Sequence, residues 1–195
     1  MASGSPIAAS LTTPTPNTST PLTGTSVTFT WTPGNIATYF EFQVGSTGPG
    51  SSNLYNSGET GATTATVTDL PSNGQTVYVR LYSLINGAWQ YTNYTYVASG
   101  SPIAAALTTP TPNTTTPLTG TSVTFTWTPG NVATAFEFWA GTLGPGSTNL
   151  YNSNETGATS ATVTDLPSNG STVYVRLYSL INGVWQYTNY TYIAE

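Results

Sequence analysis

Residues 77–97 read VYVRLYSLINGAWQYTNYTYV, and this stretch decides the fold. The dipeptide Asn86-Gly87 separates two runs rich in valine, leucine and tyrosine. Asn-Gly fits the two-residue type I′ turn, in which both central residues take positive φ angles, so the stretch predicts a β-hairpin. A two-residue turn also fixes the register, which places Ile85 opposite Ala88 and Arg80 opposite Asn93.

This register divides the hairpin into two faces, because successive side chains of a strand point to opposite sides. One face carries Val77, Val79, Leu81, Ser83, Thr92, Tyr94 and Tyr96. The other carries Tyr78, Arg80, Tyr82, Leu84, Trp89, Tyr91 and Asn93. The first face is the better core, so we expect the second to point outward. An outward face this rich in aromatic rings is unusual for a soluble domain.

Further strands precede the hairpin. Residues 26–32 alternate threonine with Val27, Phe29 and Trp31, and residues 38–44 bring Phe40 and Phe42 into the same phase. Shorter strands are expected at residues 7–11, 54–55 and 64–68, separated by turns rich in glycine, proline and asparagine. No helical periodicity is present. About seven short strands in one unit indicate an all-β fold of the Greek-key β-sandwich type.

The unit occurs twice. Ser5-Pro6-Ile7 returns as Ser101-Pro102-Ile103, and Trp31 returns as Trp127, an offset of 96 without a gap. We therefore expect two tandem sandwich domains, at residues 1–98 and 99–195. Glu195 occupies the position of Ser99, where a third copy would begin. The chain is either a two-domain protein or a part of a longer array.

The unit resembles the fibronectin type III family. The run Ser26-Val27-Thr28-Phe29-Thr30-Trp31-Thr32-Pro33 looks like the second strand of that family, and Leu70-Pro71 with Val77–Leu81 looks like its fifth turn and sixth strand. Val77 stands where the family has a corner tyrosine, so a neighbouring immunoglobulin-like class is the alternative. The resemblance implies a spacer or adhesive module of bacterial secreted or surface proteins.

The resemblance also implies that residues 39–44 pair with residues 77–85. Glu41 would then reach Arg80 across the strands, and Glu137 would reach Arg176 in the second copy. The candidate surface residues are these four together with the outward aromatic side chains: Glu41, Arg80, Tyr82, Trp89, Tyr91, Glu137, Trp139, Arg176, Tyr178, Trp185 and Tyr187. Three interpretations of this face are open. Neighbouring loops and long side chains cover it as a second core layer, or it is a contact surface for another domain or subunit, or it is a carbohydrate-binding platform.

The differences between the copies cluster. Four fall on one strand and the loop after it: Tyr39/Ala135, Gln43/Trp139, Val44/Ala140 and Thr47/Leu143. The second copy thus gains an outward tryptophan. Trp139 either fills space that the two alanines leave or adds a ring to a binding surface.

Composition narrows the possible functions. The 195 residues hold 2 Lys+Arg and 7 Asp+Glu, for a net charge of −5, and no cysteine or histidine. The usual zinc, haem and iron–sulfur ligands are missing, and so are disulfides and serine–histidine catalysis. Two arginines are too few for a nucleic-acid surface. No apolar run approaches the roughly 20 residues of a membrane-spanning helix. We expect no cofactor, no membrane insertion and no enzymatic activity.

These observations favour a structural repeat module of an extracellular or cell-surface protein. Its partners would be identical or neighbouring repeat domains, in a homo-oligomer or a filament, and it would space, stack or self-assemble. The alternative is a carbohydrate-binding or adhesive module that holds polysaccharide on the aromatic outer face. The low charge and the high threonine content suit the extracellular location.

Overall fold

A computed structural model describes residues 5–16, 19–112 and 115–195 of the chain. Each repeat contributes seven strands within these ranges. The first repeat forms β1 (Ser10–Thr13), β2 (Val27–Thr32), β3 (Phe40–Gly45), β4 (Tyr55–Thr60), β5 (Thr64–Val67), β6 (Thr76–Ile85) and β7 (Ala88–Val97). The second forms β8 (Ala106–Thr109), β9 (Val123–Thr128), β10 (Phe136–Gly141), β11 (Tyr151–Asn152), β12 (Ser160–Val163), β13 (Thr172–Ile181) and β14 (Val184–Ile193).

The chain separates into two compact units, Met1–Ser101 and Pro102–Glu195. Each unit buries its own hydrophobic core, with Phe29, Trp31 and Phe42 in the first and Phe125, Trp127 and Phe138 in the second.

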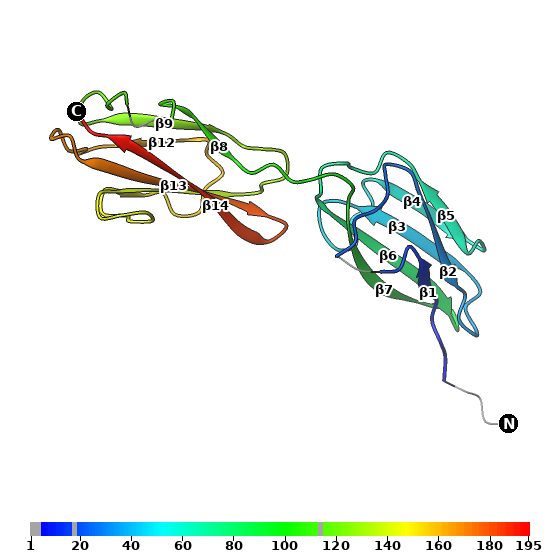
Figure 1. The fold of residues 1–195 in the computed structure, drawn as a ribbon. Coiled ribbons are helices and arrows are strands. Elements are labelled where there is room, and N and C mark those ends of the chain that lie inside the picture. The colour runs from blue at the N-terminus through cyan, green and yellow to red at the C-terminus, as the bar shows by residue number, and fades with distance from the viewer. Residues whose placement is uncertain (1–4, 17–18, 113–114) are drawn as a thin grey trace. The chain divides into compact units, whose positions relative to one another are not determined.

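Two antiparallel sheets make up each unit (Figure 1). In the first unit, a three-stranded sheet with the order β1-β2-β5 packs on a four-stranded sheet with the order β4-β3-β6-β7. The second unit repeats this arrangement with β8-β9-β12 and β11-β10-β13-β14. The predicted fold class, two tandem β-sandwiches of about seven strands, is confirmed.

The hairpin has the register that its Asn-Gly turn predicts. Ile85 pairs with Ala88, Tyr82 with Tyr91 and Arg80 with Asn93, without a shift along the ladder. Asn86 and Gly87 take φ angles of 51° and 79°, as a type I′ turn requires. Burial alternates strictly along β6, so the valine and leucine face lies in the core and the aromatic face points outward.

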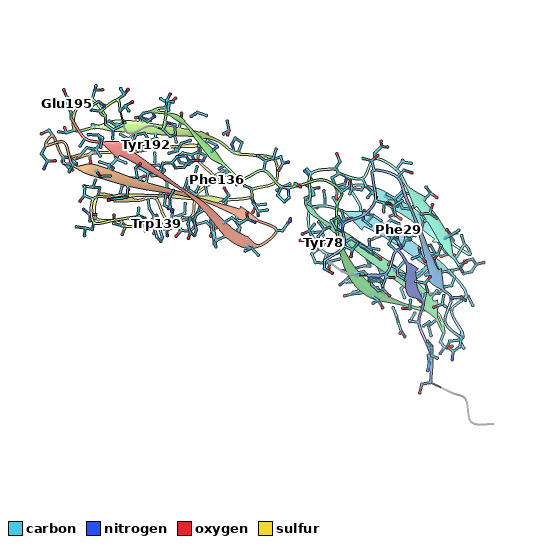
Figure 2. All side chains as sticks on the ribbon, in the orientation of Figure 1. Phe29, Tyr78, Phe136, Trp139, Tyr192 and Glu195 are labelled. Carbon is cyan, nitrogen blue, oxygen red and sulfur yellow. The ribbon has the colours of Figure 1, made fainter. Side chains whose placement is uncertain are left out.

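The core is held by stacked rings and by a few buried hydrogen bonds. Trp31 stacks on Phe42 with ring centroids 5.2 Å apart. Phe29, labelled in Figure 2, contacts both Phe42 and Tyr96. Ser83, a buried polar residue of β6, accepts a hydrogen bond of 2.9 Å from the Ala9 amide. This bond ties the N-terminal segment to the four-stranded sheet and satisfies a group that would otherwise be costly to bury.

Two strands differ most from the sequence prediction, and the others agree within one or two residues at each end. The first strand was expected from Ile7, but it begins at Ser10, because Ile7 bonds through its backbone to both the side chain and the backbone of Asn35 instead of to a ladder. The expected strand at residues 54–55 extends to Thr60 as β4 in the first unit. Its counterpart β11 has only two residues, Tyr151 and Asn152.

Candidate functional site

The outer face of each four-stranded sheet carries the candidate residues. We call this surface the aromatic face and define it, in the first unit, by Arg80, Tyr82, Trp89 and Tyr91. Arg176, Tyr178, Trp185 and Tyr187 define it in the second unit. β6 and β7, or β13 and β14, present these side chains because the hairpin register aligns Tyr82 with Tyr91 and Arg80 with Asn93.

An arginine organises the aromatic face. The Arg80 guanidinium carbon lies 4.1 Å from the centroid of the Tyr91 ring, a cation–π contact. Arg80 Nε donates to Asn93 Oδ1 at 2.8 Å, and Nη1 donates to the Tyr82 hydroxyl at 3.2 Å. The loop after β3 closes the other side, since a Cβ on Gly50 would lie 2.6 Å from the guanidinium carbon. Glycine at this position therefore lets the loop lie directly against the guanidinium.

The ion pair predicted between Glu41 and Arg80 does not form. Glu41 is opposite Tyr82 in the β3–β6 ladder, and Gln43 is the residue opposite Arg80. Glu41 Oε1 instead accepts a hydrogen bond of 2.8 Å from Gln43 Nε2. The hydrogen-bond partner of Arg80 is instead Asn93, which lies on β7, the other neighbour of β6.

The second unit shows the same correction. Glu137 is opposite Tyr178, and Arg176 bonds to Asn189 Oδ1 at 2.8 Å. Glu41 and Glu137 thus belong to the outer face but not to the arginine cluster.

The rings form an edge-to-face series. Tyr82 lies between Trp89, at a centroid distance of 6.2 Å and an interplanar angle of 87°, and Tyr91, at 5.5 Å and 60°. Tyr178 makes the corresponding contacts with Trp185 and Tyr187. T-shaped contacts of this kind stabilise a ring pair by about 0.5–1.5 kcal/mol beyond area burial. The contacts between its own rings therefore fix the shape of the aromatic face.

Trp139 extends the series in the second unit only. Trp139, labelled in Figure 2, takes the strand position at which the first unit has Gln43. Its ring centroid lies 4.8 Å from that of Tyr178. Trp139 is half-buried, and its indole Nε1 is buried without a hydrogen-bond partner. The tryptophan thus packs on the outer face as a fourth ring.

The aromatic face is only partly covered by its own unit. Arg80 and Tyr82 are half-buried, whereas Trp89 is 41% exposed and Tyr91 is 55% exposed. Trp185 and Tyr187 have exposures of 37% and 55%. The interpretation of this face as a fully covered second layer therefore does not hold for these four rings.

Metal-binding clusters, pockets and membrane-spanning helices are the other features that could mark a functional site. Within the described ranges, no three His, Cys, Asp or Glu side chains gather as a metal site would require. A pocket of about 340 Å³ lies among Pro14, Leu22 and Tyr96, and its counterpart of about 390 Å³ includes Pro110 and Leu118. No charged side chain lines either pocket. In the described part of the chain, no helix has the length and hydrophobicity needed to cross a membrane.

Two tyrosines are perturbed by burial. Burial raises the pKa of Tyr96 and of Tyr192 well above the ordinary value of 10.0, and the neighbouring Tyr94 and Tyr190 raise it further. The Tyr96 hydroxyl donates to the Pro14 carbonyl at 2.9 Å. These groups hold the first strand against the hairpin and lie on the inner side of the sheet.

Sequence reasoning missed two members of the arginine cluster. Asn93 was placed on the outer face but was not named as a partner of Arg80, although the predicted register already put the two residues opposite each other. Gly50 was counted as part of a loop. Its contact with Arg80 joins positions that no local sequence pattern connects.

Comparisons with known proteins give structural neighbours only. No family model matches the chain, and no curated protein does. A two-domain fibronectin type III segment of chicken tenascin has 15% identity and a TM-score of 0.42, over 95% of this chain and 97% of that one. Fibronectin(III)-like modules of Clostridium thermocellum CbhA have 8% identity and a TM-score of 0.35, over 96% and 94% of the two chains.

A third structure, the FN1–FN3 domains of chicken CNTN1, has 6% identity and a TM-score of 0.33. It is covered over 61% of its length, against 88% of this chain. The fold assignment rests on the strand order within each unit, in which a three-stranded sheet faces a four-stranded one. This order agrees with the predicted fibronectin type III resemblance.

Proposed function

We propose that this chain is a structural repeat module of an extracellular or cell-surface protein, which spaces, stacks or self-assembles with identical or neighbouring modules. The observation that carries the proposal is the repetition itself. Each unit is a complete sandwich with its own core, and the arginine cluster recurs with distances that agree within about 0.1 Å between Arg80 and Arg176. Duplicated self-contained units suit a spacing or assembling role, in which each added copy lengthens the array.

The arrangement of the acids does not support catalysis. Glu41 lies opposite Glu59 across β3 and β4, and this is the one cross-strand carboxylate pair in the described part of the first unit. A glycosidase needs two carboxylates about 5–10 Å apart on either side of a bound sugar. Neither glutamate lines the pocket of its unit, and Glu59 is exposed. We infer a module without enzymatic activity.

The extracellular or surface location is part of the same proposal. A chain with 5% charged residues and abundant threonine depends on hydroxyl and amide groups for its solubility. Thr28 of β2 and Thr66 of β5 bond to each other across the strands, with their Oγ1 atoms 2.8 Å apart. Fractionation of the native host would test the location, with the chain expected in the secreted or wall-associated fraction.

The experiment for the proposed function combines two measurements on the full chain. Sedimentation velocity over a concentration series reports self-assembly, and a pull-down on insoluble polysaccharides reports glycan binding. We expect no retention on any polysaccharide. Retention that is abolished by the paired substitutions Trp89→Ala and Trp185→Ala would contradict the structural-module proposal and favour the second candidate.

That second candidate is a carbohydrate-binding or adhesive module. It is favoured by the exposure of Trp89 and Tyr91 beside an arginine, because flat rings stack on the apolar faces of sugars while polar groups bond to their hydroxyls. Trp139 would enlarge the platform in the second unit. The matched control is the pair Ile7→Ala and Ile103→Ala, which removes exposed apolar side chains of 59% and 62% exposure elsewhere on the units.

A further inference from the structure

The last strand of each unit is a free sheet edge. β7 ends the four-stranded sheet of the first unit, and β14 ends that of the second (Figure 1). In an antiparallel hairpin, alternate residues exchange both backbone hydrogen bonds with the partner strand, and the residues between them direct their N–H and C=O groups to the other side. The closing pair, Ile85 and Ala88, sets this phase for β7.

The outward backbone groups of β7 therefore belong to Trp89, Tyr91, Asn93, Thr95 and Val97. The phase is supported at one end, where the Val97 carbonyl accepts a hydrogen bond of 2.8 Å from the Leu22 amide. Ile193 and Leu118 make the same bond in the second unit. For the other four residues of β7, the described residues provide no backbone partner. A segment of four consecutive outward positions is thus open.

The other three edges of the first unit are protected and β7 is not. β1 has four residues and a register shift after Leu11, β5 has four residues, and β4 carries Glu59 and a register shift against β3. β7 has ten residues without charge, proline, glycine or irregularity. Natural proteins normally guard such an edge with lysine, proline, a bulge or a covering loop, because it is a template for another strand.

Access to this edge is open from both sides of the sheet. Residues 88–93 are all exposed, including Gln90 and Thr92, which point to the inner side. The three-stranded sheet β1-β2-β5 therefore does not cover the first half of β7. Six exposed residues equal the usual length of a β-strand.

The distribution of charge favours a second copy of this chain as the strand that pairs with the β7 edge. The chain carries −5, and its first-unit carboxylates lie on or next to the other strands, as Glu41 on β3, Glu59 on β4 and Asp69 after β5. Two chains that approach through those regions repel each other. β7 itself carries no charged side chain, and the nearby Arg80 belongs to β6, one strand further from the edge, so β7 meets another β7 edge of matching length without directly opposed like charges.

We propose that two copies of this chain pair edge to edge, with β7 or β14 of one copy antiparallel to β7 or β14 of the other. This inference rests on the proposed function as an assembling module and names its contact. In a β7–β7 or a β14–β14 contact, the outward backbone groups of each copy would bond to the same groups of its partner across a twofold axis, a self-complementary interface.

The pairing would extend the sheet and the aromatic face together. Trp89, Tyr91 and Asn93 have both outward backbone groups and side chains on the aromatic face. Paired residues of adjacent strands point to the same side, so the two aromatic faces would become one surface. Each chain has two such edges, so the contact can propagate from chain to chain.

The test adds a charge to the edge without touching the aromatic face. Gln90→Lys with Gln186→Lys places an inward-pointing lysine on each edge, where a partner strand would remove it from water. The matched control is Ser52→Lys with Thr148→Lys, at exposed loop positions with the same added charge. Both variants change the net charge from −5 to −3, so general repulsion falls in both.

Sedimentation equilibrium of wild type should show a mass that rises with concentration. The edge variant should need a concentration about tenfold higher or more to reach the same mass, because the contact would bury a charge without a partner, and the loop variant should match wild type. Residue-resolved hydrogen exchange should show protection of the Trp89, Tyr91 and Asn93 amides that appears only in concentrated wild type. Unchanged thermal midpoints would show that both variants are folded.

Three results separate the possible failures. Association of the edge variant at wild-type concentrations would overturn the edge contact and leave assembly through another surface. A wild type that remains monomeric up to about millimolar concentration would overturn the edge contact and leave the spacing role intact. Glycan retention that Trp89→Ala with Trp185→Ala abolishes would instead contradict the proposed function itself.

Discussion

The two units differ most on the strand beside the hairpin and least on the hairpin. β7 and β14 differ only at Ala88/Val184 and Val97/Ile193, whereas the six-residue strands β3 and β10 differ at two adjacent positions. The arginine cluster is nevertheless the same in both units. Its geometry is therefore set by the hairpin and the glycine loop, and it does not depend on whether Gln43 or Trp139 lies beside it.

The same comparison excludes one part of one interpretation of Trp139, that it fills the space left at Ala140. Val44 and Ala140 are both fully buried on the inner side of the sheet, and Trp139 points to the outer side. The tryptophan therefore cannot fill the volume that alanine leaves in the core. The second unit has a smaller core at this point and a larger outer cluster, and these are two separate changes.

The largest effect is expected from the core tryptophans. Trp31→Ala and Trp127→Ala should each lower the free energy of unfolding of their own unit by about 3–5 kcal/mol, because each removes a buried ring stacked on a phenylalanine. Native-state hydrogen exchange of core amides measures the two units separately. A loss below about 1 kcal/mol in either unit would mean that the faces of that sheet are reversed.

The next effect separates the two cores. Val44→Ala should lower the free energy of unfolding of the first unit by about 2 kcal/mol, since it deletes two buried methyl groups and leaves part of their volume empty. The second unit, which already has Ala140, should be unchanged in the same exchange experiment. Ala140→Val is the reverse control. A loss in the second unit after Val44→Ala would show that the two cores are coupled.

High pH should weaken the two units equally. The raised pKa of Tyr96 and Tyr192 means that the folded state keeps protons that the unfolded state releases above pH 10. Their contribution to stability is therefore complete below pH 10 and falls as the pH rises further. Tyr96→Phe should cost the first unit about 1 kcal/mol at neutral pH, through loss of the bond to Pro14, and should make its decline above pH 10 shallower.

The measurement is the free energy of unfolding against pH for wild type and Tyr96→Phe, with Tyr192→Phe as the matched variant of the second unit. An equally steep alkaline decline in wild type and variant would show that other groups cause it.

The fold could be predicted from short-range signals, and the site only in part. Asn86-Gly87 fixed which residues of the hairpin face each other, and strict alternation fixed which of them are buried. To predict the partner of Arg80, one had to choose between the two neighbours of β6, which are β3 and β7. A carboxylate is the usual choice for an arginine, but the β3–β6 ladder puts Glu41 two pairs away from Arg80, and the β6–β7 ladder puts Asn93 directly opposite. The contact with Gly50 depends on loop geometry, which no periodicity encodes.

The smallest effect tests whether the extra tryptophan matters to the outer face. Trp139→Gln converts the second unit to the residue of the first, and Gln43→Trp does the reverse. Trp139→Gln should cost about 1 kcal/mol, because it removes the edge-to-face contact with Tyr178 and its half-buried ring. Gln43→Trp should gain less than this, since Glu41 would lose the hydrogen bond that Gln43 donates. Hydrogen exchange of core amides in each unit provides the measurement.

Equal and opposite changes in the two variants would show that the fourth ring acts independently of its surroundings. A loss of stability in both variants would show that each outer face is packed for its own residue. The second result would tie Trp139 to the other differences near it in the sequence, Ala135 and Leu143, which replace Tyr39 and Thr47.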